Sequence, residues 1–272
     1  MNYLLSQKIS ELNLLISNYK SIVIAFSGGV DSSFLLWYIK NNFNNKTIAF
    51  TFVNNFINKR EVEFAKMFCK KINVEHYIHT TNEITNKEIL NNPINRCYFC
   101  KKEIFSTIKK VSKEKFGIDT IFDGTNYDDE FDYRPGLKAL NELGIISPLR
   151  ITKITKKEIR FLLENNGLYE IANKPANACL ATRIPYKIEI TKEILHKIET
   201  SENFLNDLGF KEFRVRYHNE IARLEISIDE YTIICDSLIR DKIVEKLKSF
   251  GFKYVTLDLL PFKSGSMNEG IN

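Results

Sequence analysis

Short apolar runs alternate with amphipathic stretches through the first two thirds of the chain. Strand-like runs cover residues 22–26, 47–55, 74–80 and 119–124, and stretches with helical spacing cover 34–39, 59–72 and 97–117. The run 22–26 is rich in β-branched residues and has no polar position, which is typical of a strand buried on both faces. Strands that alternate with helices predict an α/β fold with a parallel sheet covered on both sides.

The pattern changes towards the C-terminus. Residues 126–150 predict a long functional loop followed by a short helix, and Thr155, Glu158 and Gly167 predict the cap, capping box and end of another helix. A linker is expected at 174–186. Beyond it the order is helix 191–208, strands 213–218 and 221–227, helix 238–250 and strand 254–259. We therefore expect two domains, 1–185 and a small α+β domain at 186–272, for which a ferredoxin-like arrangement is the candidate.

The segment between the first strand and the first helix reads SGGVDSS, residues 27–33. Glycines at a strand end let the backbone approach a ligand closely, and the first turn of a helix attracts anions such as phosphate. The Walker loop is excluded because no lysine follows in GxxxxGK[ST], and the dinucleotide motif GxGxxG is also missing. A tight turn that is rich in serine and glycine by chance is the simpler alternative.

This segment resembles the pyrophosphate loop (PP-loop) of the ATP pyrophosphatase superfamily, whose domain is adenine nucleotide alpha hydrolase-like. The resemblance implies that ATP is cut between its α and β phosphates. The implied ATP-binding residues are Ser27, Gly28, Gly29, Asp31, Ser32 and Ser33. Asp31 would also act in catalysis by positioning Mg²⁺, which prefers oxygen ligands and shared phosphates.

Composition narrows the classes of function. The 272 residues carry a net charge of +5, which suits anionic small molecules and does not by itself indicate a nucleic-acid partner. No apolar run is long enough to span a bilayer, and the first twenty residues predict an amphipathic helix and not a signal peptide. We expect a cytoplasmic protein without a membrane partner. Five cysteines in that compartment favour metal or redox chemistry over disulfides.

Three of the cysteines are candidates for such chemistry. Cys97 and Cys100 form a CxxC motif at the head of a helix, and Cys179 lies in the predicted linker. A structural zinc would need a fourth ligand, and a redox pair would leave Cys179 unused. Three thiolates suit a [4Fe–4S] cluster with one open iron, and three unrelated thiols remain the alternative. Cys69 and Cys235 have the apolar surroundings of buried structural cysteines.

Further motifs resemble the LarE family of ATP-dependent sulfur transferases over nearly the whole chain. The matching stretches are FSGGVDSS, RCYFCK, DGTNYDDEFDYRPGLKAL, SPL, KPANACLATRIPY and RVRYHNEIARLE. The resemblance implies conversion of the carboxylates of pyridinium-3,5-biscarboxylic acid mononucleotide to thiocarboxylates, for the nickel-pincer nucleotide cofactor of lactate racemase. It also implies a small-molecule nucleotide substrate and a homo-oligomer.

The family has two variants, and this sequence matches the one with three cysteines. In that variant Cys97, Cys100 and Cys179 would hold a [4Fe–4S] cluster and act in catalysis. The single-use variant gives up the sulfur of one cysteine, about one position earlier, where this chain has Ala178. The cluster variant is recyclable, so a sulfide donor system is a possible partner.

Arginines and aspartates complete the expected site. Arg214 and Arg216 alternate on one strand and match family positions tied to the substrate phosphate, and Arg183 is expected to reach the same pocket. A solvated strand face is the alternative. Asp123 and Asp129 follow a strand end, where open parallel sheets bind ligands, and are expected at the ATP or as loop caps. His218 is interpreted as a structural residue.

Other functions stay open at this point. A tRNA thiolase also joins a pyrophosphate loop to three cysteines, but it would need a nucleic-acid module or zinc ribbons. An amidating synthetase of the same superfamily would have no use for the three cysteines. A non-catalytic Fe–S or nucleotide-binding assembly factor is the alternative from another class.

Overall fold

The described residues form two compact units. The computed structural model describes residues 3–81, 84–175, 178–263 and 265–268. The first unit comprises 1–84 and 95–177, and the second 85–94 and 178–272. The second unit takes in 85–94 because α4 (Lys87–Leu90) and Asn92 accept backbone hydrogen bonds from Ile190 and Lys187. The sequence-based boundary lay after residue 185, and residues 176–177 of the predicted linker lie outside the described residues.

A parallel sheet forms the centre of the first unit. Its strands are β1 (Ser21–Ala25), β2 (Lys46–Val53), β3 (Glu75–Thr80) and β4 (Ile121–Phe122), in the order β3-β2-β1-β4. All three pairings are parallel. The α/β class predicted from the alternation of strands and helices is therefore confirmed. β4 is shorter than the predicted run 119–124, and its last residue, Phe122, also forms a parallel bridge with Ile146.

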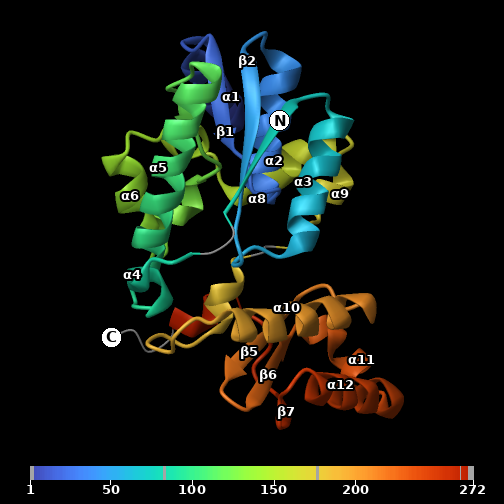
Figure 1. The fold of residues 1–272 in the computed structure, drawn as a ribbon. Helices are drawn as coiled ribbons and strands as arrows, with labels where there is room; N and C mark the ends of the chain where they lie inside the picture. The colour runs from blue at the N-terminus through green and yellow to red at the C-terminus, as the bar shows by residue number, and fades with distance from the viewer. Residues whose placement is uncertain (1–2, 82–83, 176–177, 264, 269–272) are drawn as a thin grey trace. The chain divides into compact units, whose positions relative to one another are not determined.

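Helices cover both faces of this sheet (Figure 1). They are α1 (Tyr3–Ser17), α2 (Val30–Asn42), α3 (Lys59–Lys71), α5 (Arg96–Phe116), α6 (Gly136–Glu142), α7 (Pro148–Ile151), α8 (Lys156–Asn165) and α9 (Tyr169–Ala172). Ile22 and Ile24 of β1 pack with α1, α2, α3, α8 and α9, whereas Val23 between them packs with α5 and α6. A strand with apolar side chains on both sides needs this double cover, since successive side chains point to opposite faces.

The second unit is built on a three-stranded sheet. β5 (Phe213–His218) pairs antiparallel with β6 (Ile221–Ile226), which pairs parallel with β7 (Tyr254–Leu257). The helices are α10 (Lys192–Asp207), α11 (Tyr231–Cys235) and α12 (Ser237–Ser249), with short turns η2 (Leu180–Arg183), η3 (Ile228–Glu230) and η4 (Ser266–Asn268). The α+β character is confirmed. The ferredoxin-like arrangement is wrong, because the described residues of this unit form three strands and not four.

One face of the small sheet is apolar and the other is charged. Val215 and Leu224 are fully or almost fully buried in the core of this unit. The alternate positions on the opposite face are arginine and glutamate, and the register pairs Arg214 with Glu225 and Arg216 with Arg223. Both arginines of β5 thus lie on one face, as their spacing predicted.

Candidate functional site

The glycine pair shapes the loop between β1 and α2. Gly28 has φ +75, a backbone conformation that residues with a side chain rarely adopt. A Cβ there would lie 3.2 Å from Phe64 Cδ1. Gly29 is the N-cap of α2 and has extended backbone angles without a side-chain cap bond. The first N–H groups of this 13-residue helix are therefore not satisfied by a side chain at the cap, which is the arrangement that attracts phosphate.

The serines of the loop have two different environments. Ser32 donates to the Gly29 carbonyl at 3.2 Å, and its Oγ lies 3.3 Å from Ser27 Oγ. Ser33 is completely buried, and its Oγ makes no hydrogen bond among the described residues. Ser27 and Ser32 are thus arranged to present hydroxyls at the loop, whereas the Ser33 side chain faces the interior.

Gly124 presses the segment after β4 against the start of α2. A Cβ at this position would lie 2.8 Å from Ser32 N and 2.9 Å from Ser32 Cα, distances that real Cβ atoms do not show. Only glycine fits here without moving the backbone of the loop. Gly124 lies in the stretch DGTNYDDEFDYRPGLKAL, whose sequence pattern does not predict this steric role.

Asp31 lies where a cation could be held. Its Oδ2 accepts hydrogen bonds from Asn126 Nδ2 at 3.2 Å and from Lys156 Nζ at 3.1 Å. Its Oδ1 is buried and makes no hydrogen bond among the described residues. A buried carboxylate oxygen without a partner is costly, and a hard oxygen-seeking ion such as Mg²⁺ would satisfy it. The donor set therefore fits the magnesium expected at Asp31.

Helix α8 brings Lys156 to this carboxylate. Thr155 accepts from Glu158 N, and Glu158 Oε2 accepts from Thr155 N, so the predicted capping box is confirmed. Lys156 is the first helical residue after this cap, and its backbone N–H also binds Asp128. Lys156 and Asn126 were not predicted as site residues, and nothing in the spacing of the sequence connects them with Asp31.

The two other predicted aspartates lie in the loop that follows β4. Asp123 is 3% exposed, its Oδ2 accepts from Thr125, and its Oδ1 makes no hydrogen bond among the described residues. Asp129 accepts from Asn126 N at 3.0 Å and pairs with Arg134 at 2.7 Å. Burial raises the pKa of Asp129, while Arg134 and the Asn126 bond oppose that shift. Asp129 caps η1 (Tyr127–Phe131) in a capping box with Asn126, whereas Asp123 keeps an oxygen that could bind a ligand.

The three candidate cysteines are partly exposed thiols. Cys97 and Cys100 lie three residues apart in the first turns of α5, and therefore on one helix face. Cys179 immediately precedes η2 in the second unit. Thiolate is the donor that Fe–S clusters require, so the donor set fits the cluster. Among the described residues, no group of three or more His, Cys, Asp or Glu side chains is gathered as a metal site.

The two remaining cysteines differ from each other. Cys69 is buried in α3, and burial raises its pKa to about 12. Its environment agrees with a structural thiol. Cys235 is exposed, so the expectation that it is buried is wrong, because α11 ends at this residue and turns it outward.

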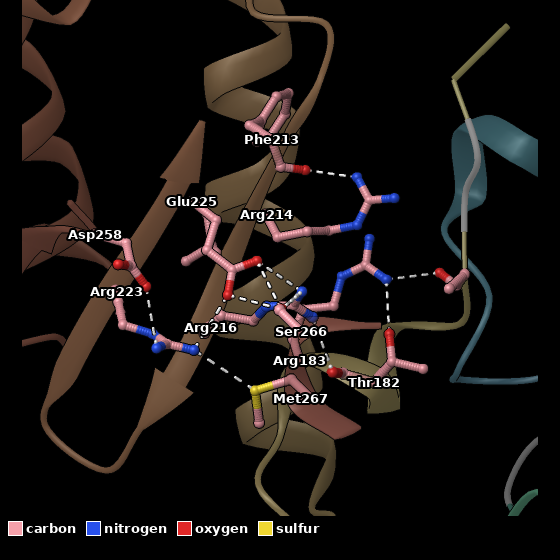
Figure 2. A network of polar contacts seen from close by, with 12 residues as sticks. Thr182, Arg183, Phe213, Arg214, Arg216, Arg223, Glu225, Asp258, Ser266 and Met267 are labelled. Atoms are coloured by element: carbon pink, nitrogen blue, oxygen red, sulfur yellow. Dashed lines mark hydrogen bonds and ion pairs between the residues drawn. The ribbon is translucent and has the colours of Figure 1, made fainter. Parts of the chain in front are cut away.

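Arginines and carboxylates form a network on the charged face of the small sheet (Figure 2). Arg216 donates to Glu225 Oε2 at 2.7 Å, to Thr182 O at 3.0 Å and to Ser266 Oγ at 2.8 Å. Arg223 donates to Glu225 Oε1 and pairs with Asp258, both at 3.1 Å. The Nε atoms of Arg216 and Arg223 are buried and make no hydrogen bond among the described residues. These two donors are suited to an anion.

Arg214 lies beside this pair and is 6% exposed. Its guanidinium lies over the ring of Phe262, 4.6 Å from the centroid, and donates to the Phe213 carbonyl at 2.5 Å. Burial lowers its pKa to about 10, and Arg183 and Arg216 add to that effect. His218 on the same face has a pKa lowered by burial, then by Arg223 and Arg216. An anion in this neighbourhood would relieve the repulsion between the guanidinium groups.

Arg183 is the most enclosed of the arginines, at 1% exposure. It forms a bidentate ion pair with Glu202, with Nε donating to Oε1 at 2.8 Å and Nη2 donating to Oε2 at 2.9 Å. Its Nη1 donates to the carbonyls of Ala178 and Cys179 at 2.8 and 3.2 Å. These contacts hold the backbone at Cys179 in place. Its expected contact with the substrate phosphate stays a prediction.

The parallel sheet, the strand–glycine loop–helix unit and the carboxylate at the helix start together define a PP-loop ATP pyrophosphatase domain. The family of the queuosine biosynthesis protein QueC matches residues 21–134, which include this loop. Longer matches cover both units. A protein of Synechocystis sp. is 35% identical over 98% of both chains, and one of Methanocaldococcus jannaschii is 37% identical over 90% of this chain and 92% of that one.

A third relative carries a specific name. The pyridinium-3,5-bisthiocarboxylic acid mononucleotide synthase of Lactiplantibacillus plantarum is 31% identical over 97% of this chain and 95% of its own. The chain belongs to the family of that synthase, the LarE family, and is an enzyme. Membership of the PP-loop class implies ATP and Mg²⁺. No helix in the described part of the chain is long and apolar enough to cross a membrane.

Proposed function

We propose that this enzyme activates the carboxylates of pyridinium-3,5-biscarboxylic acid mononucleotide with ATP and converts them to thiocarboxylates, with sulfur delivered through a [4Fe–4S] cluster. The observation that carries the proposal is the match to the named synthase over 97% of this chain, a span long enough to take in the segments that hold Cys179 and the arginine network. The QueC family ends its match at residue 134, before either of these features. This difference favours sulfur transfer over the amidating alternative.

Activation is needed because a carboxylate is a poor electrophile. One of its oxygens attacks the α-phosphorus of ATP, and the bond to the bridging oxygen breaks to release pyrophosphate. The first N–H groups of α2 and the hydroxyls of Ser27 and Ser32 bind the negative charge that develops on the leaving group. Asp31 would hold Mg²⁺ through its free Oδ1. The resulting acyl adenylate has AMP as a good leaving group.

Arg214 and Arg216 are assigned to the phosphate of the substrate nucleotide. Four arginines meet three carboxylates on this face of the sheet, namely Arg183, Arg214, Arg216 and Arg223 with Glu202, Glu225 and Asp258. The positive excess and the two unpaired Nε donors favour an anion here. Arg183 is assigned to positioning the backbone of Cys179.

Cys97, Cys100 and Cys179 would hold the cluster, which supplies a sulfide as nucleophile when it is bound. A homo-oligomer and an external sulfide donor belong to the same proposal. Protein purified without oxygen is expected to contain about four irons per chain and to absorb broadly in the visible range. Colourless protein that binds stoichiometric zinc would reject the cluster.

The decisive experiment separates activation from sulfur transfer. Cys179→Ala is expected to abolish thiocarboxylate formation and to leave substrate-dependent pyrophosphate release measurable, because the cysteine lies outside the pyrophosphate loop. Cys235→Ala is the matched control, since Cys235 is exposed and has no assigned role. Pyrophosphate and thiocarboxylate are measured in the same anaerobic reaction. Equal loss of both products in Cys179→Ala, or full thiocarboxylate yield, would contradict the assignment.

A further inference from the structure

Lys174 is a largely buried cation of the first unit to which the mechanism above gives no role. Its side chain is 12% exposed, and its Nζ donates to Glu61 Oε2 at 2.8 Å. The same Nζ donates to the carbonyl oxygen of Gly28 at 2.8 Å. It also lies 3.4 Å from the centroid of the Phe64 ring. Lys174 therefore contacts the backbone of the pyrophosphate loop directly, although it is 146 residues away in sequence.

The residues packed around Gly28 hold the Lys174 ammonium at the loop carbonyl. Helix α3 supplies both Glu61 and Phe64, and the glycine packs so closely that an added Cβ would lie 3.2 Å from the phenyl ring and 3.4 Å from the Glu61 carbonyl. The Phe64 ring is itself fixed by stacking on Phe68, at 6.1 Å between centroids and 6° between planes. The ammonium is thus positioned by a carboxylate, an aromatic face and the loop carbonyl together.

This contact fixes the orientation of the peptide between Gly28 and Gly29. In a trans peptide the C=O and the next N–H point in opposite directions, so a restraint on the Gly28 carbonyl also aims the Gly29 N–H. That N–H donates to Ser27 Oγ at 3.3 Å, so it points to the side of the loop where the hydroxyls lie. A peptide between two glycines rotates easily, since neither residue has a Cβ to oppose it. If it rotated, the carbonyl would meet the phosphate oxygens instead.

We propose that Lys174 is a positioning residue of the ATP site, which holds the Gly28 carbonyl away from the phosphates and so keeps the Gly29 N–H directed at them. Glu61 balances the charge of Lys174 through their ion pair. The proposal depends on ATP binding and not on the acyl substrate or the cluster. Its failure is therefore distinguishable from failure of the proposed sulfur transfer.

The test is a titration of the full-length protein with MgATP and, separately, with magnesium pyrophosphate. Lys174→Met is expected to weaken both ligands by roughly tenfold to a hundredfold, the range of one charge-assisted hydrogen bond. Glu61→Gln removes the same ion pair but keeps the ammonium on the Gly28 carbonyl, and is expected to bind within about threefold of wild type, a change smaller than one such bond. The matched control is Lys66→Met on the same helix as Glu61, which removes an exposed ion pair with Glu63.

Two outcomes would overturn the proposal. One is wild-type affinity in Lys174→Met, and the other is equal weakening in Glu61→Gln, which would indicate that the ion pair only stabilises the fold. Thermal melting of each variant is measured alongside. If Lys174→Met does not fold, Lys174→Arg decides: its longer guanidinium displaces the carbonyl, so weaker MgATP binding at a near-native melting temperature supports the positioning role, and unchanged binding rejects it.

Discussion

The pyrophosphate loop and the arginine network are both suited to anions, but they are built in opposite ways. In the loop, backbone N–H groups and small side chains form the site, and two glycines set its shape: Gly28 through its positive φ and Gly124 because a Cβ has no room there. In the network, charged side chains form the site, and Arg183, Arg216 and Arg223 each pair with a carboxylate. The loop is therefore sensitive to steric change and the network to loss of charge.

The largest effect is expected in the network. Glu202→Gln removes the partner of Arg183, and an uncompensated buried charge costs about 3–5 kcal/mol in the free energy of unfolding. The matched control is Glu193→Gln on the same helix, because Glu193 is exposed and pairs with Lys197 one turn away. Chemical denaturation of both variants measures the difference. Equal denaturation midpoints for the two variants would show that the stability of the second unit does not depend on the charge balance of Arg183.

The stability of the protein at acid pH should also depend on the charge of Glu202. Burial raises the pKa of Glu202, but Arg183, Arg214 and the hydrogen bond from Val215 N together outweigh it, so the pKa in the folded protein lies below the ordinary value. The carboxylate then contributes stability that is present above about pH 4.5 and is lost as the pH falls through its folded pKa. Glu202→Gln should therefore have a shallower loss of stability below pH 4.5 than wild type. The same slope in both proteins would contradict this account.

A steric change in the loop is expected to have an intermediate effect. Gly124→Ala forces its Cβ against the Ser32 backbone and should cost about 1–3 kcal/mol, the range for overpacking, while weakening MgATP binding. Gly29→Ala is the comparison, because its Cβ would meet only Ser27 Oγ, at 3.4 Å, and its φ is ordinary. Its stability should stay near that of wild type. A Gly124→Ala protein with wild-type stability and MgATP affinity would show that the loop tolerates a Cβ at residue 124.

The smallest effect is expected from the loss of a helix N-cap, and it should differ between a cap near the pyrophosphate loop and a cap in the second unit. Thr155→Ala should cost about 1 kcal/mol and weaken MgATP binding slightly, since α8 carries Lys156 next to Asp31. Thr191→Ala removes the N-cap of α10, which bonds Ile194 N at 3.2 Å, and should cost a similar amount without changing MgATP binding. Denaturation and titration of the two variants give the comparison. Parallel changes in MgATP affinity would argue against a local effect of α8.

Local patterns predicted the parts of the molecule that local rules control. The buried strand at 22–26, the glycine loop and the Thr155 cap each follow from neighbouring residues, and the alternation of Arg214 and Arg216 sets their shared face. The three-stranded sheet was harder, because the number of strands depends on packing within the unit.

Partners that are distant in sequence could not be predicted. Asp31 meets Lys156 across 125 residues, and Gly28 meets Lys174 across 146. Such contacts depend on how helices pack on the sheet, which no spacing along one chain records. Glu202 and Glu225 were missed for the same reason, although an arginine pair buried in a small unit requires carboxylates nearby.

The ammonium of Lys156 on Asp31 has a consequence for metal exchange. A magnesium ion bound at this aspartate would meet a carboxylate that is already paired with the ammonium of a neighbouring helix. Its attraction for the ion would be weaker than that of an isolated carboxylate, so the ion would leave more readily with the pyrophosphate. A lysine beside the aspartate would thus favour turnover over tight retention.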